Sequence, residues 1–268
     1  MQPVDLAFEV FGESNADPII ILHGFLASSR NWRSVAKTLS ERHCVYVLDM
    51  RNHGASPHAE LMDYPAMALD ILHFMECIGL DSAHLLGHSM GGKVAMWFAL
   101  HYPARVKQLM VVDIAPVAYR HSFDPMIHAL RQLPLRALTN RKQAEQYLAE
   151  TIPDLAFRQF LLQNLLLREG AYSWRIDLDI IQRNAHHIVG FPETQVRIFA
   201  DEALFIAGQH SSYVDAESVT LHFPKATIEV IPDTGHWLYV EAPDRFCELV
   251  LRWLADSSLT RSSLRWPL

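Results

Sequence analysis

Short apolar runs alternate with longer amphipathic stretches along most of the chain. Runs of strand length are Leu6–Phe11, Pro18–Leu22, Cys44–Asp49, Ala83–Leu86, Gln108–Asp113, Leu204–Ala207 and Thr227–Ile231. Stretches of helix length and period are Ser29–Leu39, Tyr64–Ile78, Met90–His101, Tyr213–Phe223 and Pro243–Ala255. Buried strands separated by helices are typical of a mostly parallel sheet with crossover helices on both faces. The pattern therefore predicts an α/β fold.

The alternation stops between residues 116 and 190. This stretch keeps a helical period, is rich in Leu, Arg and Gln, and is interrupted by Pro125, Pro134 and Pro153. Because the strand–helix pattern resumes afterwards, we expect three or four helices inserted into one domain as a cap over the sheet. The predicted organisation is a core of residues 1–115 and 191–256, a helical cap of residues 116–190, and a poorly ordered tail of residues 257–268.

Composition narrows the classes of partner. Half of the 268 residues are apolar, a fifth are charged, and the net charge is −7 with no block of Lys or Arg. That balance argues against nucleic acid or an anionic membrane surface as a partner. The N-terminus has no secretory-signal pattern, and no apolar run reaches the roughly 20 residues of a membrane span. We expect a cytoplasmic monomer or small homo-oligomer that acts on a small molecule.

Metal and cofactor sites are not expected. Cys44, Cys77 and Cys247 lie far apart, and no pair of them has the spacing of metal ligands, so we expect buried free thiols in a reducing compartment. The 15 histidines are scattered, and the adjacent His186 and His187 are expected on a helix surface.

The strongest chemical signal is the pentapeptide Gly87-His88-Ser89-Met90-Gly91. It follows an apolar run and opens a helix-like stretch, which is the strand–turn–helix context of a nucleophile elbow. Glycines on both sides permit a turn sharp enough to expose the Ser89 hydroxyl. The start of the following helix favours a developing oxyanion there. We predict that Ser89 is a catalytic nucleophile.

A serine nucleophile needs a base, and His236 is the leading candidate. It lies in Pro232-Asp233-Thr234-Gly235-His236-Trp237, directly after the last strand-like run and therefore at the same sheet edge as Ser89. His23 and His88 flank strand ends and are expected to shape the site, while His53 lies on a loop.

Four features together resemble the α/β-hydrolase family from about residue 3 to residue 255. They are His23-Gly24-Phe25, the run Asp49-Met50-Arg51-Asn52-His53-Gly54-Ala55-Ser56, the Ser89 elbow and Gly235-His236-Trp237. The Arg-Asn-His-Gly run, Val112-Asp113-Ile114-Ala115-Pro116 and the run Leu204–Val214 are similar to the bacterial YbfF-type esterases and their mitochondrial hydrolase-domain relatives. This resemblance implies the α/β-hydrolase fold with a helical cap and a Ser-His-acid triad.

The acid departs from the general family pattern. The loop that usually carries it reads Gly208-Gln209-His210-Ser211, with serine in place of a carboxylate. Asp215 lies four residues further on, inside the expected helix, and would have to reach back to the site. Asp113 ends the strand after the nucleophile helix, beside the Ser89 strand. We favour Asp113, which the YbfF-like resemblance also implies; the alternative roles are Asp215 as the acid and Asp113 as an N-cap of the first cap helix. Ser211 would then support Asp113 or His236 by a hydrogen bond.

The oxyanion hole is expected from the backbone amides of Met90 and Phe25. Leu26, His88 and Trp237 are expected to line or shape the substrate pocket. Asp49, Arg51 and Ser56 are expected to brace their loop.

The predicted activity is hydrolysis of carboxylic esters, and also of acyl thioesters such as acyl-CoA, through an acyl-enzyme. Serine at position 89 argues against the dehalogenases and epoxide hydrolases of this fold, whose nucleophile is aspartate. Two alternatives stay open: a carbon–carbon bond hydrolase of meta-cleavage type, and a non-enzymatic ligand-binding protein on the same scaffold.

Overall fold

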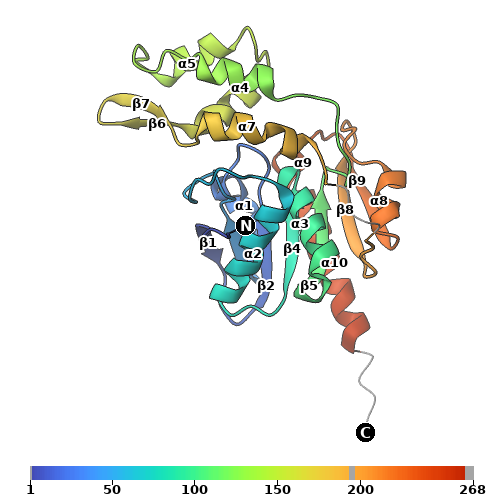
Figure 1. Ribbon diagram of the computed structural model, residues 1–268. Helices are drawn as coiled ribbons and strands as arrows, with labels where there is room; N and C mark the ends of the chain where they lie inside the picture. Colours follow the sequence, from blue (N-terminus) through green and yellow to red (C-terminus); the bar gives the residue numbers. More distant parts are fainter. Residues whose placement is uncertain (1, 193–196, 263–268) are drawn as a thin grey trace.

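A seven-stranded sheet forms the centre of the molecule (Figure 1). The computed structural model describes residues 2–192 and 197–262. The strand order is β1-β3-β2-β4-β5-β8-β9. The strands are β1 (Phe8–Phe11), β2 (Asp17–Leu22), β3 (His43–Leu48), β4 (Ala83–His88), β5 (Val106–Val112), β8 (Ala203–Gly208) and β9 (Ala226–Ile231). Only the β1–β3 pair within this sheet is antiparallel, which confirms the mostly parallel sheet expected from the sequence.

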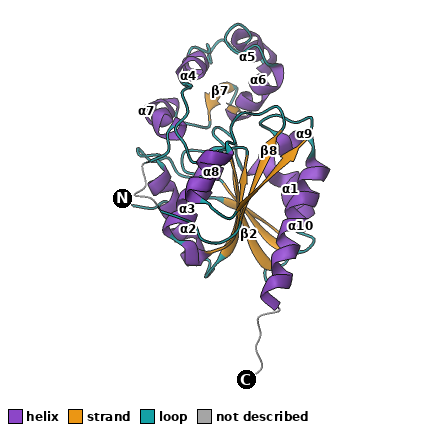
Figure 2. Cartoon of the chain, turned by 90° about the vertical axis from the view of Figure 1, so that its right-hand side faces the viewer, coloured by secondary structure: helices purple, strands orange, loops and turns teal. Residues whose placement is uncertain are grey.

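Helices cover both faces of the sheet (Figure 2). On one face lie α2 (Tyr64–Cys77), α3 (Met90–His101) and α8 (Ala216–His222), and on the other lie α1 (Arg33–Leu39), α9 (Leu238–Glu241) and α10 (Pro243–Ser262). Every residue of β4 is buried between the two layers. Strands that are buried on both faces have continuous apolar sequences, which is why the sequence pattern predicted them.

The segment between β5 and β8 lies over the carboxyl edge of the sheet (Figures 1 and 2). It contains α4 (Asp124–Arg131), α5 (Arg141–Leu148), α6 (Leu155–Leu161) and α7 (Leu178–Val189). A short 3-10 turn, η3 (Leu162–Asn164), leads into an antiparallel hairpin of β6 (Leu165–Arg168) and β7 (Ala171–Trp174). The sequence analysis expected helices here and missed the hairpin. Its two turn residues, Glu169 and Gly170, both have positive φ, but Glu-Gly lacks the usual Asn-Gly or Asp-Gly signal.

The end of α7 is bonded to the core. The Tyr64 hydroxyl donates to Ile188 O at 2.6 Å, and the Lys93 ammonium, on α3, donates to Val189 O and Gly190 O at 2.9 and 2.6 Å. Burial lowers the pKa of Lys93 to about 7. The carbonyls at the end of a helix have no intrahelical partner, so these core donors satisfy them and hold the cap in place.

Several boundaries differ from those expected. The first four residues of the Ser29–Leu39 stretch form a 3-10 turn, η1 (Ser29–Trp32), before α1. Residues 257–262, expected in a poorly ordered tail, continue α10; residues 263–268 of that tail lie outside the described residues. Cys44 and Cys247 are buried, whereas Cys77 is exposed, so the expectation of three buried thiols was wrong for Cys77.

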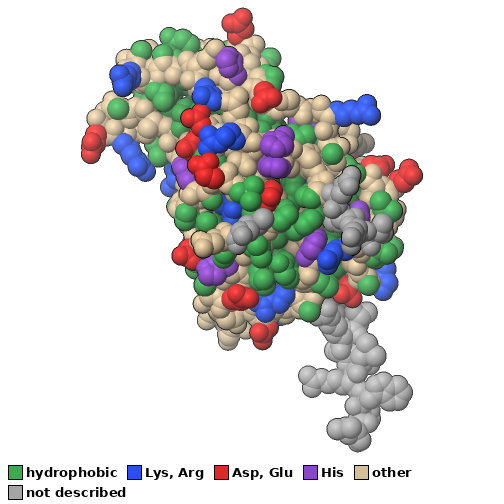
Figure 3. Space-filling view, in the orientation of Figure 1, with side chains coloured by type: hydrophobic (Ala, Val, Ile, Leu, Met, Phe, Trp, Pro, Cys, Tyr) green, Lys and Arg blue, Asp and Glu red, His purple; other side chains and the backbone are tan. Residues whose placement is uncertain are grey.

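Charges of both signs are mixed over the face of the molecule drawn in Figure 3. Figure 3 shows Lys and Arg side chains interspersed with Asp and Glu on the cap and the core alike. Among the helices of residues 2–192 and 197–262, none is both long and apolar enough to cross a bilayer.

Candidate active site

Ser89 lies in the turn between β4 and α3. Its backbone has φ 51° and ψ −118°, a strained conformation for a residue with a side chain. A Cβ on Gly87 would lie 2.3 Å from Gly91 O, and one on Gly91 would lie 2.2 Å from Leu22 O. Both glycines are therefore required for the close packing of this turn. Met90 begins α3, so its amide belongs to the group at a helix start that has no intrahelical acceptor.

Asp113 and His236 form a hydrogen-bonded pair. His236 Nδ1 lies 2.7 Å from Asp113 Oδ2, and Asp113 is fully buried at the end of β5. The carboxylate also accepts hydrogen bonds from Gly208 N at 3.0 Å and from Ser211 Oγ at 2.5 Å. Because an ionised carboxylate only accepts, His236 donates through Nδ1 and its Nε2 remains a proton acceptor.

The two aspartates considered for the acid lie in different places. Asp215 is the N-cap of α8, where its exposed carboxylate accepts from Ser218 N at 2.9 Å, rather than part of the helix as expected. The first cap helix, α4, begins at Asp124 after the N-cap Phe123, so Asp113 does not cap it. The structure thus places Asp113 beside His236, and Asp215 in a local helix cap.

The Gly208–Ser211 loop packs tightly against the loop that carries His236. A Cβ on Gly208 would lie 2.2 Å from Gly235 O, so only glycine permits this approach. The serine that replaces the usual acid contacts Asp113 through its hydroxyl.

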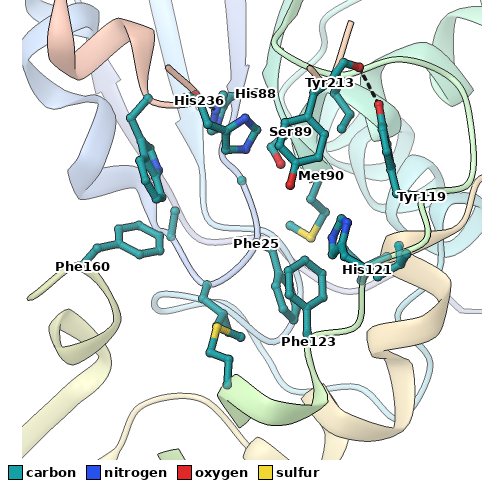
Figure 4. Close-up of a pocket in the computed structure, with 18 of the residues that line it drawn as sticks. Phe25, His88, Ser89, Met90, Tyr119, His121, Phe123, Phe160, Tyr213 and His236 are labelled. Atoms are coloured by element: carbon teal, nitrogen blue, oxygen red, sulfur yellow. Dashed lines mark hydrogen bonds between the residues drawn. The ribbon is translucent and has the colours of Figure 1, made fainter. Parts of the chain in front are cut away.

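Ser89 and His236 border one cavity of about 370 Å³ (Figure 4). Phe25, Leu26, His88, Met90 and Trp237, which were also predicted to form or line the site, border it too, whereas the predicted Asp113 and Ser211 are not among its lining residues. Ser89, His236 and Tyr213 lie together at one end of the cavity, whereas Phe25, Phe123 and Phe160 line the side toward the cap. The arrangement brings a hydroxyl and an imidazole to the end of an apolar pocket.

Aromatic residues of the cap, together with Tyr213 of the core, complete the cavity, and none of them was predicted from the sequence. Phe157 and Phe160 on α6 pack against Trp237 with ring centroids 5.6 and 5.9 Å apart. Tyr213 lies 4.6 Å from the His236 ring, and Tyr119 donates its hydroxyl to Tyr213 O at 2.6 Å (Figure 4). Spacing of three residues puts Phe157 and Phe160 on one helix face. That spacing was a visible signal, but it did not reveal which face meets the core.

The second predicted oxyanion donor, Phe25, lies in a tight turn from Gly24 to Ala27. Ala27 N donates to Gly24 O at 3.1 Å, and Leu26 has a φ of 61°. A positive φ at the third residue alone is the signature of a type II turn. His53 supports the turn, because its Nε2 accepts from Leu26 N at 3.0 Å while its Nδ1 donates to Arg51 O at 2.9 Å.

Three buried histidines surround the site as neutral side chains. Burial lowers the pKa values of His23, His53 and His88, that of His53 to about 3 and that of His88 to well below its usual value. His88 Nε2 donates to His236 O at 2.8 Å, which anchors the backbone of the candidate base. His23 Nδ1 donates to Gly24 O at 2.8 Å and its Nε2 accepts from Met50 N. The roles of His23 and His53 need the neutral imidazole, since the Nε2 that accepts from a backbone amide must lack a proton.

One possible metal-ligand group occurs among the described residues, away from the cavity lining. The ligand atoms of Asp5, His73 and Cys77 lie within 4.8 Å of one another. This group was not expected from the sequence, although His73 and Cys77 are four residues apart and so lie on one face of α2. Asp5 and Cys77 are exposed, and His73 Nε2 is already paired with Asp5 at 2.9 Å.

Residues 17–243 match the family model described as the alpha/beta hydrolase fold. The chain belongs to the α/β-hydrolase family. This hydrolase is 36% identical over 264 residues to a protein of Danio rerio named sn-1-specific diacylglycerol lipase ABHD11, a match that covers 94% of this chain and 83% of the relative. It is 33% identical to esterase YbfF of Escherichia coli, over 91% of this chain and 95% of YbfF.

A solved structure of a marine microorganism esterase is also similar to this hydrolase. It superposes with a TM-score of 0.89 at 38% identity, covering 93% of this chain and 99% of the esterase. Together with the YbfF match, this confirms the resemblance to YbfF-type esterases that the sequence motifs indicated.

The neutral buried histidines predict that acid destabilises the hydrolase. Between pH 6.5 and about 3, unfolded His53 binds a proton that folded His53 does not, so the free energy of unfolding falls as the pH is lowered. The slope for one such group reaches about 1.4 kcal/mol per pH unit. Urea unfolding at pH 7.5 and 5.5 should show a smaller acid loss for His53→Gln than for the wild type. The exposed His58→Gln should match the wild type; equal pH dependence in all three proteins would contradict the assignment.

Proposed function

We propose that this protein is a carboxylic ester hydrolase with Ser89 as nucleophile, His236 as general base and Asp113 as the acid of the triad. The observation that carries the proposal is that the strained Ser89 elbow and His236, which is paired with the buried Asp113, border one apolar cavity. The names of the relatives, esterase and lipase, support the same reaction class.

The reaction proceeds in two halves. Ser89 Oγ transfers its proton to His236 Nε2 and attacks the ester carbonyl carbon, whose oxygen becomes an oxyanion. His236 then gives that proton to the leaving alcohol as the carbon–oxygen bond breaks, which leaves an acyl group on Ser89. Water repeats the sequence, releases the carboxylic acid and restores the Ser89 hydroxyl.

The amides of Phe25 and Met90 stabilise the oxyanion in both halves. A helix start supplies one donor and the type II turn supplies the other. A single oxyanion donor contributes about 3 kcal/mol to the transition state in a site that excludes water.

Asp113 holds His236 in the tautomer with Nδ1 protonated and stabilises the imidazolium that forms. The hydrogen bonds that its carboxylate accepts from Gly208 N and Ser211 Oγ offset part of the cost of its burial. Ser211 acts through Asp113 as a positioning residue.

The cavity favours esters with short to medium acyl chains. Its volume of about 370 Å³ is near the lower end of the range of small-molecule pockets, about 300–1,000 Å³. Phe157, Phe160 and Trp237 line it together, and their packing limits the length of an acyl chain. The same acyl transfer applies to thioesters such as acyl-CoA, and the lipase name of the Danio rerio relative adds acylglycerols to the substrates worth testing.

Ser89→Ala should abolish ester hydrolysis and labelling by a fluorophosphonate probe. Loss of a serine nucleophile removes the covalent route and lowers kcat by ~10⁴-fold or more. Turnover of p-nitrophenyl butyrate and in-gel probe fluorescence measure the two effects, with the exposed Ser34→Ala as the control that keeps both. Probe labelling that survives in Ser89→Ala would overturn the nucleophile.

Asp113→Asn should lower kcat by roughly 10⁴-fold, because the amide favours the wrong imidazole tautomer. Asp215→Asn should change kcat little, since Asp215 caps α8. Steady-state kinetics of both variants with the same ester decides between the aspartates; the opposite ranking would move the acid to Asp215.

A substrate panel should place the maximum of kcat/KM at short to medium acyl chains. The panel contains p-nitrophenyl esters from acetate to palmitate, acyl-CoA thioesters, a diacylglycerol and a meta-cleavage dienoate. A maximum at palmitate would contradict the size argument from the cavity. Ser89-dependent turnover of the dienoate above that of every ester would favour the carbon–carbon hydrolase, and absence of all turnover would favour the ligand-binding role.

A further inference from the structure

The turn that presents the Phe25 amide contains a residue poorly suited to it. The third position of a type II turn requires positive φ and normally carries Gly or Asn. Here that position is Leu26, with a φ of 61°. A residue with a Cβ holds this conformation only when its surroundings fix it.

Both polar backbone groups of Leu26 are fixed by long-range partners. The N–H donates to His53 Nε2 of the core, and the carbonyl oxygen accepts from Asn164 Nδ2 at 2.8 Å. Asn164 lies in η3 of the cap, 138 residues away in sequence. The partners of Leu26 therefore come from two separate layers of the molecule.

The contact between Leu26 and Asn164 is closed to solvent. Leu26 is 2% exposed and Asn164 is 3% exposed. Asn164 Nδ2 also lies 3.4 Å from Leu161 O at the end of α6, which restrains the orientation of the amide. If the donor were removed, Leu26 O would be left buried with its partner lost.

We propose that Asn164 is a positioning residue that couples docking of the cap to the geometry of the oxyanion hole. Each peptide unit is a rigid plane. His53 fixes the plane that precedes the Leu26 Cα, and Asn164 fixes the plane that follows it. With both planes held, Leu26 keeps its positive φ and the Phe25 amide keeps its direction.

Loss of the Asn164 donor releases this restraint. The peptide plane that follows the Leu26 Cα is then free to rotate, and Leu26 relaxes toward negative φ against the single remaining bond from His53. The central peptide of the turn and the adjacent Phe25 amide shift with it. The substrate pocket keeps its lining residues, so ground-state binding changes little while the transition state loses a well-aimed donor. This inference rests on the proposed ester hydrolysis at Ser89.

A neighbouring contact provides a matched control. The exposed Gln163 accepts from Asn31 Nδ2 at 3.0 Å and so joins the same part of the cap to the core. It does not bond to the Gly24–Ala27 turn. If Asn164 served only to hold the cap against the core, Gln163→Ala would have the same effects as loss of the Asn164 side chain.

The test compares Asn164→Asp, which keeps the size of the side chain but replaces the donor by an acceptor, with Gln163→Ala and the wild type. Each is assayed for kcat and KM with p-nitrophenyl butyrate. Each is also assayed for inhibition by a trifluoromethyl ketone, which adds to Ser89 and forms an oxyanion, and by the corresponding alcohol, which does not. We expect kcat of Asn164→Asp to fall by roughly 10- to 100-fold, the range for a misplaced catalytic group.

The ketone inhibition constant should rise by a similar factor, whereas KM and the alcohol inhibition constant should stay within about twofold of the wild type, as uniform binding is retained. Gln163→Ala should resemble the wild type in all four values. The coupling would be overturned by an unchanged kcat in Asn164→Asp, or by an equal rise of the alcohol and ketone inhibition constants in that variant. The same losses in Gln163→Ala would overturn it too. Asn164→Ser, too short to reach Leu26 O, replaces Asn164→Asp if thermal unfolding shows that the carboxylate variant does not fold. Failure of the proposed function is separate, because it appears in the wild type as absent Ser89-dependent hydrolysis.

Discussion

The hydrogen bond between Asp113 and His236 organises the carboxyl edge of the sheet. It joins the end of β5 to the loop after β9, across the intervening strand β8. Asp113 is fully buried, so its charge must be compensated by protein donors. These come from the loop after β8, through Gly208 N and Ser211 Oγ, and from His236. One carboxylate therefore fixes the ends of three adjacent strands relative to one another.

The rest of the site is built around this pair. Parallel strand order brings the Ser89 elbow, after β4, next to the end of β5. The neutral His88 bonds to the His236 backbone and His53 bonds to the Phe25–Leu26 turn. Their pKa values are low because both rings are buried, and both rings hold backbone groups in place rather than exchange protons. The cap adds apolar side chains to the cavity lining and, through Asn164, a hydrogen bond to the Phe25–Leu26 turn.

Sequence reasoning succeeded where local pattern and topology were enough. The seven strands were placed within two residues of their observed ends, because buried parallel strands are continuous apolar runs. Asp113 was favoured as the acid because Ser211 occupies the usual acid position and parallel strands end at one edge, and its catalytic role stays a prediction. The structure then places its carboxylate 2.7 Å from His236.

The structural features that the sequence did not predict depend on contacts between segments far apart in the chain. No local pattern states that Asn164 meets Leu26, or that Phe157 and Phe160 meet Trp237. The β6–β7 hairpin uses a Glu-Gly turn that sequence rules rank poorly. Asp215 was expected within a helix that starts at Tyr213, but its side chain caps a helix that starts at Ala216, a shift of three positions in the boundary.

The imidazole tautomer of His236 tests the central claim most directly. A long-range ¹⁵N–¹H correlation spectrum of uniformly labelled protein at neutral pH distinguishes a protonated Nδ1 from a protonated Nε2. The account predicts that the neutral His236 ring carries its proton on Nδ1, directed at Asp113, and leaves Nε2 free to accept from Ser89. A neutral ring protonated on Nε2 would contradict it.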